Sequence, residues 1–281
     1  MSSRPVKVAV VGHIEWVQFA RVPKVPAAGT VMHAREGFEE PAGGGAVAAV
    51  QLARLAGSAT LFTALGDDEH GHRSLERLTQ LGVSVHRVLR AAPTRRAVTL
   101  IDDGGERTII TFGERLEPHA EDTSLPWEQL AEMDAVYFTA GDVGALRAAR
   151  AATVLVASPR ARHALGHDIP LDALVLSHGD ATERGEADRA EKDARLIALT
   201  DGERGGSYSL RDGSGGSWQP AVLPGEALDS YGCGDSFAAG LTFGLGAGLE
   251  IAEAFSLAAR CGAVCLTGRG PYQRQLTAAD L

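Results

Sequence analysis

The residues best suited to chemistry lie close together in the last quarter of the chain. Gly232, Cys233 and Gly234 are followed at once by Asp235, and apolar and small residues continue to Leu245. This order predicts a tight glycine turn that opens into a buried helix. The free amides of a helix's first turn and the positive end of its dipole suit a phosphate group. Asp235 would lie inside such a site as a carboxylate that can accept a proton.

A base beside an anion site is the arrangement that transfer of a phosphoryl group to a hydroxyl requires, because that reaction depends on positioning and charge stabilisation. An ordinary turn, with Asp235 as the cap of the helix, would account for the same residues. The small residues Ala238, Ala239 and Gly240 favour the first interpretation, because close packing of the helix would fix the turn. Cys233 is either a small residue that fills the turn or a thiolate favoured by the helix N-terminus.

The segment from Asp229 to Gly240 resembles a motif of the ribokinase-like carbohydrate kinases, the phosphofructokinase-B family. The family pattern is D-T-x-G-A-G-D-x-F-x-x-G, and the chain departs from it only by Ser for Thr and Cys for Ala. The resemblance implies that Asp235 is the catalytic base. It also implies that an anion hole is formed by the backbone amides of Gly232, Cys233 and Gly234.

The resemblance extends to the nucleotide side. The segment from Thr200 to Gly205, after an expected strand, resembles the family's T-x-G-x-x-G turn, and residues 267–270 resemble its T-R-x-G turn. The resemblance implies a site for ATP made by Ser177, Thr200, Gly202, Gly205 and Arg269. The family's N-x-x-E magnesium element is matched only loosely by the segment from Ser177 to Asp180, so Asp180 is expected to hold Mg²⁺ through water. The resemblance leaves open whether a monovalent cation such as K⁺ also activates the enzyme.

On the acceptor side the glycine segment is kept and the polar contacts are changed. Gly43, Gly44 and Gly45 resemble the family's sugar-contacting glycines. Where the family has G-S-I-N-x-D, however, Glu15 replaces Asn and Val17 replaces Asp, and Ala48 stands where the family has a second Asn. Specificity for a sugar depends on paired hydrogen bonds, so ribose should be a poor acceptor. Glu15 is the candidate for binding a different acceptor.

Strands and helices alternate along the chain, which predicts an α/β fold with three layers and a central, mostly parallel sheet. Strands are expected at 6–11, 59–65, 135–139, 153–157, 174–177 and 196–200, with a hairpin at 207–210 and 217–222. Helices are expected at 46–56, 70–81, 235–245 and 250–266. Segments of about 13–40 and 95–113 break the alternation. The resemblance makes them a small β lid inserted into a single domain over residues 1–281; an edge extension of the main sheet is the alternative.

Composition is that of an ordinary globular protein. The chain has 281 residues, 44% of them hydrophobic, and a formal net charge of −9, which argues against a nucleic-acid partner. The apolar run Val8 to Val11 is too short for the core of a signal peptide, and no apolar stretch is long enough to span a bilayer. Three cysteines do not suggest a disulfide framework. We therefore expect a cytoplasmic enzyme with a small-molecule substrate.

The sequence thus predicts an ATP-dependent, Mg²⁺-requiring kinase that phosphorylates a hydroxyl of a small sugar or sugar-like acceptor. The resemblance also allows a homodimer that forms through the β lid. Alternatives are a nucleoside kinase and a ligand-binding family member that has lost turnover. A dinucleotide-dependent dehydrogenase is disfavoured, because no G-x-G-x-x-G follows the first strand at Gly12.

Overall fold

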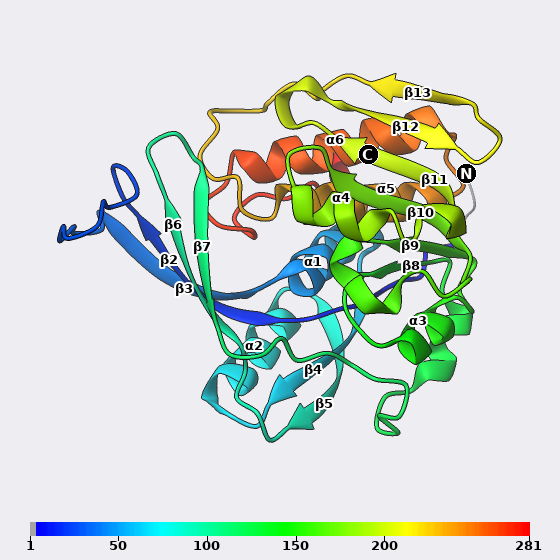
Figure 1. The fold of residues 1–281 in the computed structure, drawn as a ribbon, viewed down its shortest axis with the longest axis horizontal. Coiled ribbons are helices and arrows are strands. Elements are labelled where there is room, and N and C mark those ends of the chain that lie inside the picture. The colour runs from blue at the N-terminus through cyan, green and yellow to red at the C-terminus, as the bar shows by residue number, and fades with distance from the viewer. Residues whose placement is uncertain (1–3) are drawn as a thin grey trace.

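A nine-stranded sheet forms the centre of the computed structural model, which describes residues 4–281 (Figure 1). Its strand order is β13-β12-β11-β10-β9-β8-β1-β4-β5, and all neighbours are parallel except β11–β12 and β12–β13. The strands are β1 (Val8–Val11), β4 (Ala59–Gly66), β5 (Val83–Arg90), β8 (Ala135–Phe138), β9 (Val154–Ala157), β10 (Leu171–Ser177), β11 (Ala194–Thr200), β12 (Gly206–Leu210) and β13 (Gly215–Trp218).

Helices cover both faces of this sheet. They are α1 (Gly44–Ala56), α2 (Glu69–Gln80), α3 (Val143–Ala149), α4 (Ala181–Ala187), α5 (Cys233–Gly246) and α6 (Ile251–Leu266). One core cluster joins sheet residues such as Val10 to α1, α5 and α6, and a second joins Val11 and Phe138 to α3 and α4. Because both faces are buried, β1 reads as a continuous apolar run rather than an alternating one. The predicted three-layer α/β fold with a mostly parallel central sheet is confirmed.

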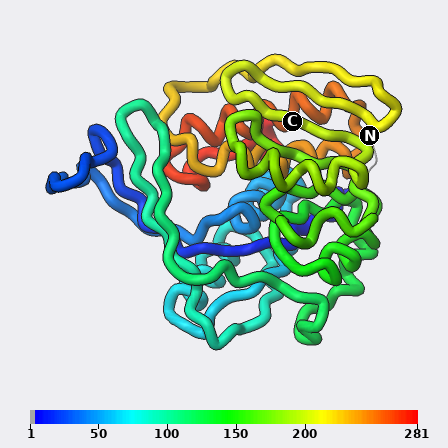
Figure 2. Tube along the Cα trace, in the orientation of Figure 1, coloured from blue at the N-terminus to red at the C-terminus, as the bar shows by residue number. Residues whose placement is uncertain are grey.

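A separate four-stranded sheet projects from one side of the molecule (Figures 1 and 2). Its order is β3-β2-β6-β7, with only β2 and β6 parallel. The strands are β2 (Glu15–Arg21), β3 (Glu36–Ala42), β6 (Arg96–Ile101) and β7 (Arg107–Phe112), and they lie almost entirely within the two segments that break the alternation. The segments therefore do not extend an edge of the central sheet.

The tip of the β6–β7 hairpin contacts the loop before α5. The amide of Ser230 donates to the carbonyl oxygen of Gly105 at 3.0 Å, and Arg107 donates to the carbonyl oxygen and to the hydroxyl of Ser230 at 3.0 and 3.1 Å. Arg21 of β2 donates to the carbonyl oxygen of Leu228 at 3.3 Å. The small sheet is thus attached to the loop that leads into the glycine turn.

The structure differs from the sequence-based expectations in a few boundaries. β1 begins at Val8, and the edge strand β5 was not predicted. Two helices begin earlier than expected because glycines at positive φ, Gly43 and Gly232, precede them and glycines enter their first turns. No helix of residues 4–281 is long and apolar enough to cross a membrane.

Candidate active site

The glycine turn and α5 have the predicted arrangement. Gly232 caps α5 in the left-handed conformation at φ 82°, and a Cβ there would lie 2.9 Å from Cγ1 of Val47. Asp229 is fully buried and accepts hydrogen bonds from the amides of Tyr231 and Gly270, each at 2.9 Å. The Asp229 carboxylate therefore fixes the glycine turn and holds the turn at Gly270 against it.

Asp235 lies in the first turn of α5 and is only 8% exposed. The start of α1 packs directly against it, since a Cβ on Gly44 would lie 3.0 Å from Oδ1 of Asp235 and 3.1 Å from Oγ1 of Thr139. By contrast, a Cβ on Gly234 would meet no atom within 4 Å, so the backbone there faces open space. The structure brings together the predicted base, the predicted anion hole and the glycine segment of residues 43–45.

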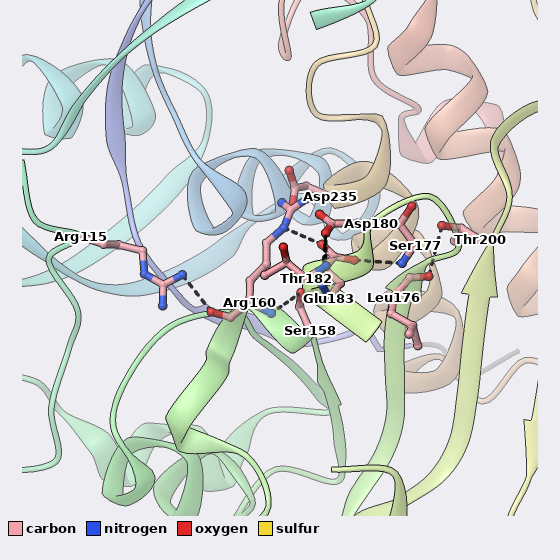
Figure 3. Close-up of polar contacts among 10 residues, drawn as sticks. All are labelled: Arg115, Ser158, Arg160, Leu176, Ser177, Asp180, Thr182, Glu183, Thr200 and Asp235. Atoms are coloured by element: carbon pink, nitrogen blue, oxygen red, sulfur yellow. Dashed lines mark hydrogen bonds and ion pairs between the residues drawn. The ribbon is translucent and has the colours of Figure 1, made fainter. Parts of the chain in front are cut away.

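The sequence analysis missed two residues of this site. Arg160 contacts the Asp235 carboxylate, and Glu183 pairs with Arg160. Nη1 of Arg160 lies 3.2 Å from Oδ1 of Asp235, and Nε of Arg160 donates to Oε1 of Glu183 at 2.8 Å (Figure 3). The other oxygen of Glu183 accepts from the amide of Ser177 at 2.9 Å. The negative charge of Asp235 raises the pKa of Arg160, so the guanidinium stays charged between the two carboxylates.

A sequence signal for Glu183 was present. The spacing of N-x-x-E is matched by Asp180 and Glu183, with Asp in place of Asn, rather than by the segment that ends at Asp180. Asp180 itself caps α4, and its Oδ1 accepts from the amides of Thr182 and Glu183 at 2.9 and 3.1 Å. Arg160 had no such signal, because it lies in the short 3₁₀ segment Pro159–Ala164, 75 residues from Asp235.

Most of the predicted nucleotide residues gather where β10 and β11 end. Ser177 and Thr200 are partners across these two strands, and the Thr200 hydroxyl donates to the carbonyl oxygen of Leu176 at 3.3 Å. Gly202 and Gly205 form the next turn at φ 54° and 79°, and a Cβ on Gly205 would lie 2.2 Å from the carbonyl oxygen of Trp218. These glycines are therefore required by the turn itself.

Arg269 is placed elsewhere. Its guanidinium pairs with Glu36 at 2.9 Å and lies over the ring of Phe38 at 4.0 Å, and both partners belong to β3 of the small sheet. The structure thus does not bring this side chain to Thr200 and the turn after it. Its role at a nucleotide site stays a prediction for the backbone of its turn alone.

On the acceptor side, His13 and Glu15 are buried at the junction between β1 and β2. Oε1 of Glu15 lies 3.3 Å from Nε of Arg95 and 3.7 Å from Nε2 of His13. Burial raises the pKa of Glu15, against the attraction of Arg95, and burial lowers the pKa of His13 well below its usual value. The charge of Asp235 also acts on Glu15, so the two carboxylates are electrostatic neighbours.

The positions that depart from the family's polar contacts are filled by packing. Val17 and Ala48 are fully buried in the hydrophobic core. Trp16 stacks on His70 with ring centroids 5.4 Å apart and lies under the guanidinium of Arg73 at 4.2 Å. Its Nε1 donates to Glu39 at 3.2 Å. The ring of Trp16 is therefore already packed by the protein and is only 5% exposed.

The pKa of Cys233 lies well above its usual value, because the neighbouring Cys265 thiol and burial both raise it. The neighbouring Cys233 thiol in turn lowers the pKa of Cys265. Sγ of Cys233 donates to the carbonyl oxygen of Asp229 at 3.8 Å. The expectation that the helix N-terminus favours a Cys233 thiolate is wrong, because the neighbouring thiol and burial outweigh the helix dipole.

Comparison with known proteins gives the family. Two segments, residues 6–167 and 161–278, match the model of the pfkB family carbohydrate kinases. Together these segments span nearly the whole chain. The chain belongs to this family. This pfkB carbohydrate kinase is 26% identical over 291 residues to an ATP-dependent ribose-1-phosphate kinase from Halopiger xanaduensis, covering 92% of this chain and 91% of the relative.

Solved structures agree in fold with this pfkB kinase. Arabidopsis thaliana ribokinase in complex with ribose and ATP matches with a TM-score of 0.74 and 17% identity, covering 99% of this chain and 97% of that one. Adenosine kinase from Sinorhizobium meliloti matches with a TM-score of 0.77 and 19% identity, covering 99% and 98%. At these identities the likeness shows the shared fold alone. Substrate choice depends on the residues of the site.

Proposed function

We propose that this carbohydrate kinase transfers the γ-phosphoryl group of ATP to a hydroxyl of a small sugar or sugar-like acceptor. The observation that carries the proposal is the position of Asp235: it lies in the first turn of α5, against Gly44 and beside the open backbone of Gly234. A carboxylate at a helix N-terminus, next to amides that can hold an anion, suits proton removal during phosphoryl transfer.

In the proposed step the acceptor oxygen forms a bond to the γ-phosphorus while the bond from that phosphorus to the β,γ-bridging oxygen breaks. The proton of the acceptor hydroxyl moves to the carboxylate of Asp235, and ADP leaves with the bridging oxygen. The amides of Gly232, Cys233 and Gly234 stabilise the charge on the transferred group. Arg160 keeps the Asp235 carboxylate oriented through Oδ1.

The residues around the end of β10 fit Mg²⁺ that is held mainly by water and phosphate. Within residues 4–281 no three His, Cys, Asp or Glu side chains form a metal cluster, and Mg²⁺ commonly binds through only one or two carboxylates and substrate oxygens. Asp180 would hold its water shell, and Glu183, which lies one helical turn further along and is paired with Arg160 and Ser177, would support that site. The metal would neutralise charge on the phosphates.

The changed acceptor residues support a substrate other than ribose, because core packing occupies the positions of Val17 and Ala48. A nucleoside acceptor is less well supported, since the ring of Trp16 is already stacked and cannot receive a base. A family member that has lost turnover is less well supported too, because the base and the glycine turn are intact.

We also propose that a second copy packs on the small sheet. β7 exposes Ile109, Ile110 and Phe112 at 42%, 52% and 47%. Exposed apolar side chains in a row on one strand are typical of an interface. Ile110→Glu should shift the sedimentation mass toward the monomer, whereas an unchanged monomeric mass in both proteins would reject the dimer.

The function is tested by ADP release from Mg-ATP over a panel of sugars, sugar phosphates, sugar acids and nucleosides, with the phosphorylated product identified by mass spectrometry. The same assay in K⁺ or Na⁺ buffers, with and without EDTA, measures the cation requirements. An acceptor that accelerates ADP release, with phosphate on its hydroxyl, supports the proposal. ATP binding without acceleration by any member of the panel would instead support lost turnover.

A further inference from the structure

Four arginines converge on the acceptor side of the site. Arg95 immediately precedes β6 and Arg115 follows β7, whereas Arg160 and Arg162 lie in the 3₁₀ segment Pro159–Ala164 after β9. The charges of all four act on the buried ring of His13. Nη1 of Arg115 also donates to the carbonyl oxygen of Arg160 at 2.8 Å, which joins the two segments (Figure 3). We call these residues the arginine cluster.

The cluster is crowded with like charge. The Arg115 side chain is only 8% exposed, and burial lowers its pKa against the attraction of Glu117, while the charges of Arg162 and Arg95 lower it further. Like charges held this close repel each other, and the repulsion is strongest where water is excluded. An anion bound among them would remove that cost.

The protein's own carboxylates do not use the full binding capacity of the cluster. Arg95, Arg115 and Arg160 are paired with Glu15, Glu117 and the Glu183–Asp235 pair, respectively. Arg162 is exposed and has no carboxylate partner within residues 4–281, and its backbone has a positive φ of 49°. Nδ1 of His13 is buried without a hydrogen-bond partner among the described residues. In the part of the chain that the structure describes, an unpaired guanidinium and an unpaired ring nitrogen therefore remain in and beside the cluster.

A neutral hydroxyl does not need this arrangement. Guanidinium groups match the planar, paired oxygens of carboxylate and phosphate, and such charge-assisted hydrogen bonds are roughly twice as strong as neutral ones. Two members of the cluster are also separate from the proposed anion hole, because Arg95 and Arg115 flank the small sheet and contact Glu15 and Glu117 rather than the glycine turn.

We propose that the acceptor carries an anionic group of its own, a phosphate or a carboxylate, which the arginine cluster binds while Asp235 receives the proton of the reacting hydroxyl. Arg160, in contact with Asp235, lies nearest the reacting hydroxyl, and Arg95, Arg115 and Arg162 bind the anionic group. This inference rests on the proposed kinase function and narrows its substrate class to sugar phosphates or sugar acids.

The test compares matched acceptors that differ only in charge. Calorimetry, with a non-hydrolysable ATP analogue present, measures the binding of ribose against ribose 1-phosphate and ribose 5-phosphate, of fructose against its 1- and 6-phosphates, and of glucose against gluconate. At least one anionic member should bind about 100-fold more tightly than its neutral partner, because several charged hydrogen bonds are added. The phosphate and carboxylate arms identify the anionic group.

Variants then assign the effect to the cluster. Arg115→Gln and Arg162→Gln should raise the KM of the anionic acceptor about 10- to 100-fold and leave the KM of ATP unchanged. Arg147→Gln, at an arginine exposed on α3, is the matched control and should change neither. Because Arg162 is on the surface, its variant should fold even where the Arg115 variant does not.

Tighter binding or faster turnover of the neutral member in every pair would overturn the inference and leave the kinase proposal standing. A rise in the KM of ATP alone would do the same, since it would assign the cluster to the nucleotide. If no acceptor is turned over, the kinase proposal fails, and the calorimetric comparison still decides whether the site selects anions.

Discussion

The two halves of the site are built in different ways. The transfer side, which is the turn from Gly232 to Asp235 together with Gly44, is made largely of backbone, which is too crowded for a Cβ at Gly232 and Gly44 and open at Gly234. The acceptor side is made of side chains, with His13, Glu15 and the arginine cluster contributed by separate segments. The backbone half keeps the family's motif, and the side-chain half departs from it.

The electrostatics of the two sides differ in the same sense. The transfer side has one carboxylate, Asp235, oriented by one guanidinium. The acceptor side has several buried charges whose pKa values are shifted mainly by burial, upward for Glu15 and downward for His13 and Arg115. The rate of phosphoryl transfer should therefore be sensitive to small displacements of the transfer side. The choice of acceptor should depend on which side chains are present on the acceptor side. The following experiments test this contrast.

The largest effect should come from Asp235→Asn. General-base catalysis contributes about 10²–10⁴-fold, so kcat should fall by that factor while the affinity for ATP changes little. Rapid-quench or coupled ADP assays with the best acceptor measure it. Asp67→Asn, at a carboxylate with a side chain 68% exposed, is the control for loss of charge alone. A variant of Asp235 with nearly full turnover would show that the base is another group.

Gly44→Ala should damage the transfer side by steric contact. The new Cβ would lie 3.0 Å from Oδ1 of Asp235, and a displacement of about 1 Å can cost about 100-fold in rate. We expect a lower kcat in a folded protein. Gly185→Ala, in α4 where a Cβ meets no atom within 4 Å, should leave kcat unchanged. Equal turnover in the two variants would mean that Asp235 is not confined by α1.

Glu15→Gln tests the acceptor side through pH. Because the pKa of Glu15 is raised in the folded protein above its ordinary value of 4.5, the folded state binds this proton more tightly than the unfolded chain. The contribution of Glu15 to stability is therefore present below pH 4.5 and is lost as pH rises through the raised pKa.

The Gln variant cannot ionise, so it should gain stability relative to the parent protein as pH rises through that window. Urea unfolding at a series of pH values measures the difference. A gap that narrows or reverses with rising pH would mean that pairing with Arg95 outweighs burial.

The smallest effect should come from Cys233→Ala. Only the amide of this residue is assigned to the anion hole, and the pKa of its half-buried thiol is raised, so turnover should stay within a few-fold of the parent. Iodoacetamide at neutral pH should modify the native protein slowly, as peptide mass mapping would show. Rapid modification of Cys233, with loss of activity, would restore the thiolate interpretation.

Much of the fold and of the transfer side could be predicted from the sequence, because the information is local. Alternating apolar strands and helices define the layers, and the contiguous motif ending at Gly240 specifies its own turn. Fold class and family are confirmed. The helix starts at Gly44 and Cys233 were missed, since glycine lowers helix propensity and only tertiary contacts show that larger residues would not fit.

The acceptor side could not be predicted, because its contacts join distant residues. Arg160 reaches Asp235 across 75 residues, and no motif marks it. The Cys265 thiol of another helix raises the pKa of Cys233, which reverses a conclusion drawn from the helix dipole alone. β5 was not predicted because His86, Arg87 and Arg90 interrupt its apolar pattern.

The contact between the β6–β7 hairpin and Ser230 has a consequence for the timing of the reaction. If the small sheet swings away to release the product, the bonds from Arg107 and from the Ser230 amide must break. The same loop continues into Gly232, so opening would loosen the turn that holds the phosphoryl group. Product release and disassembly of the catalytic turn would then be one event. ATP bound while the acceptor is absent would face an incomplete catalytic turn, so its phosphoryl group would not be transferred to water.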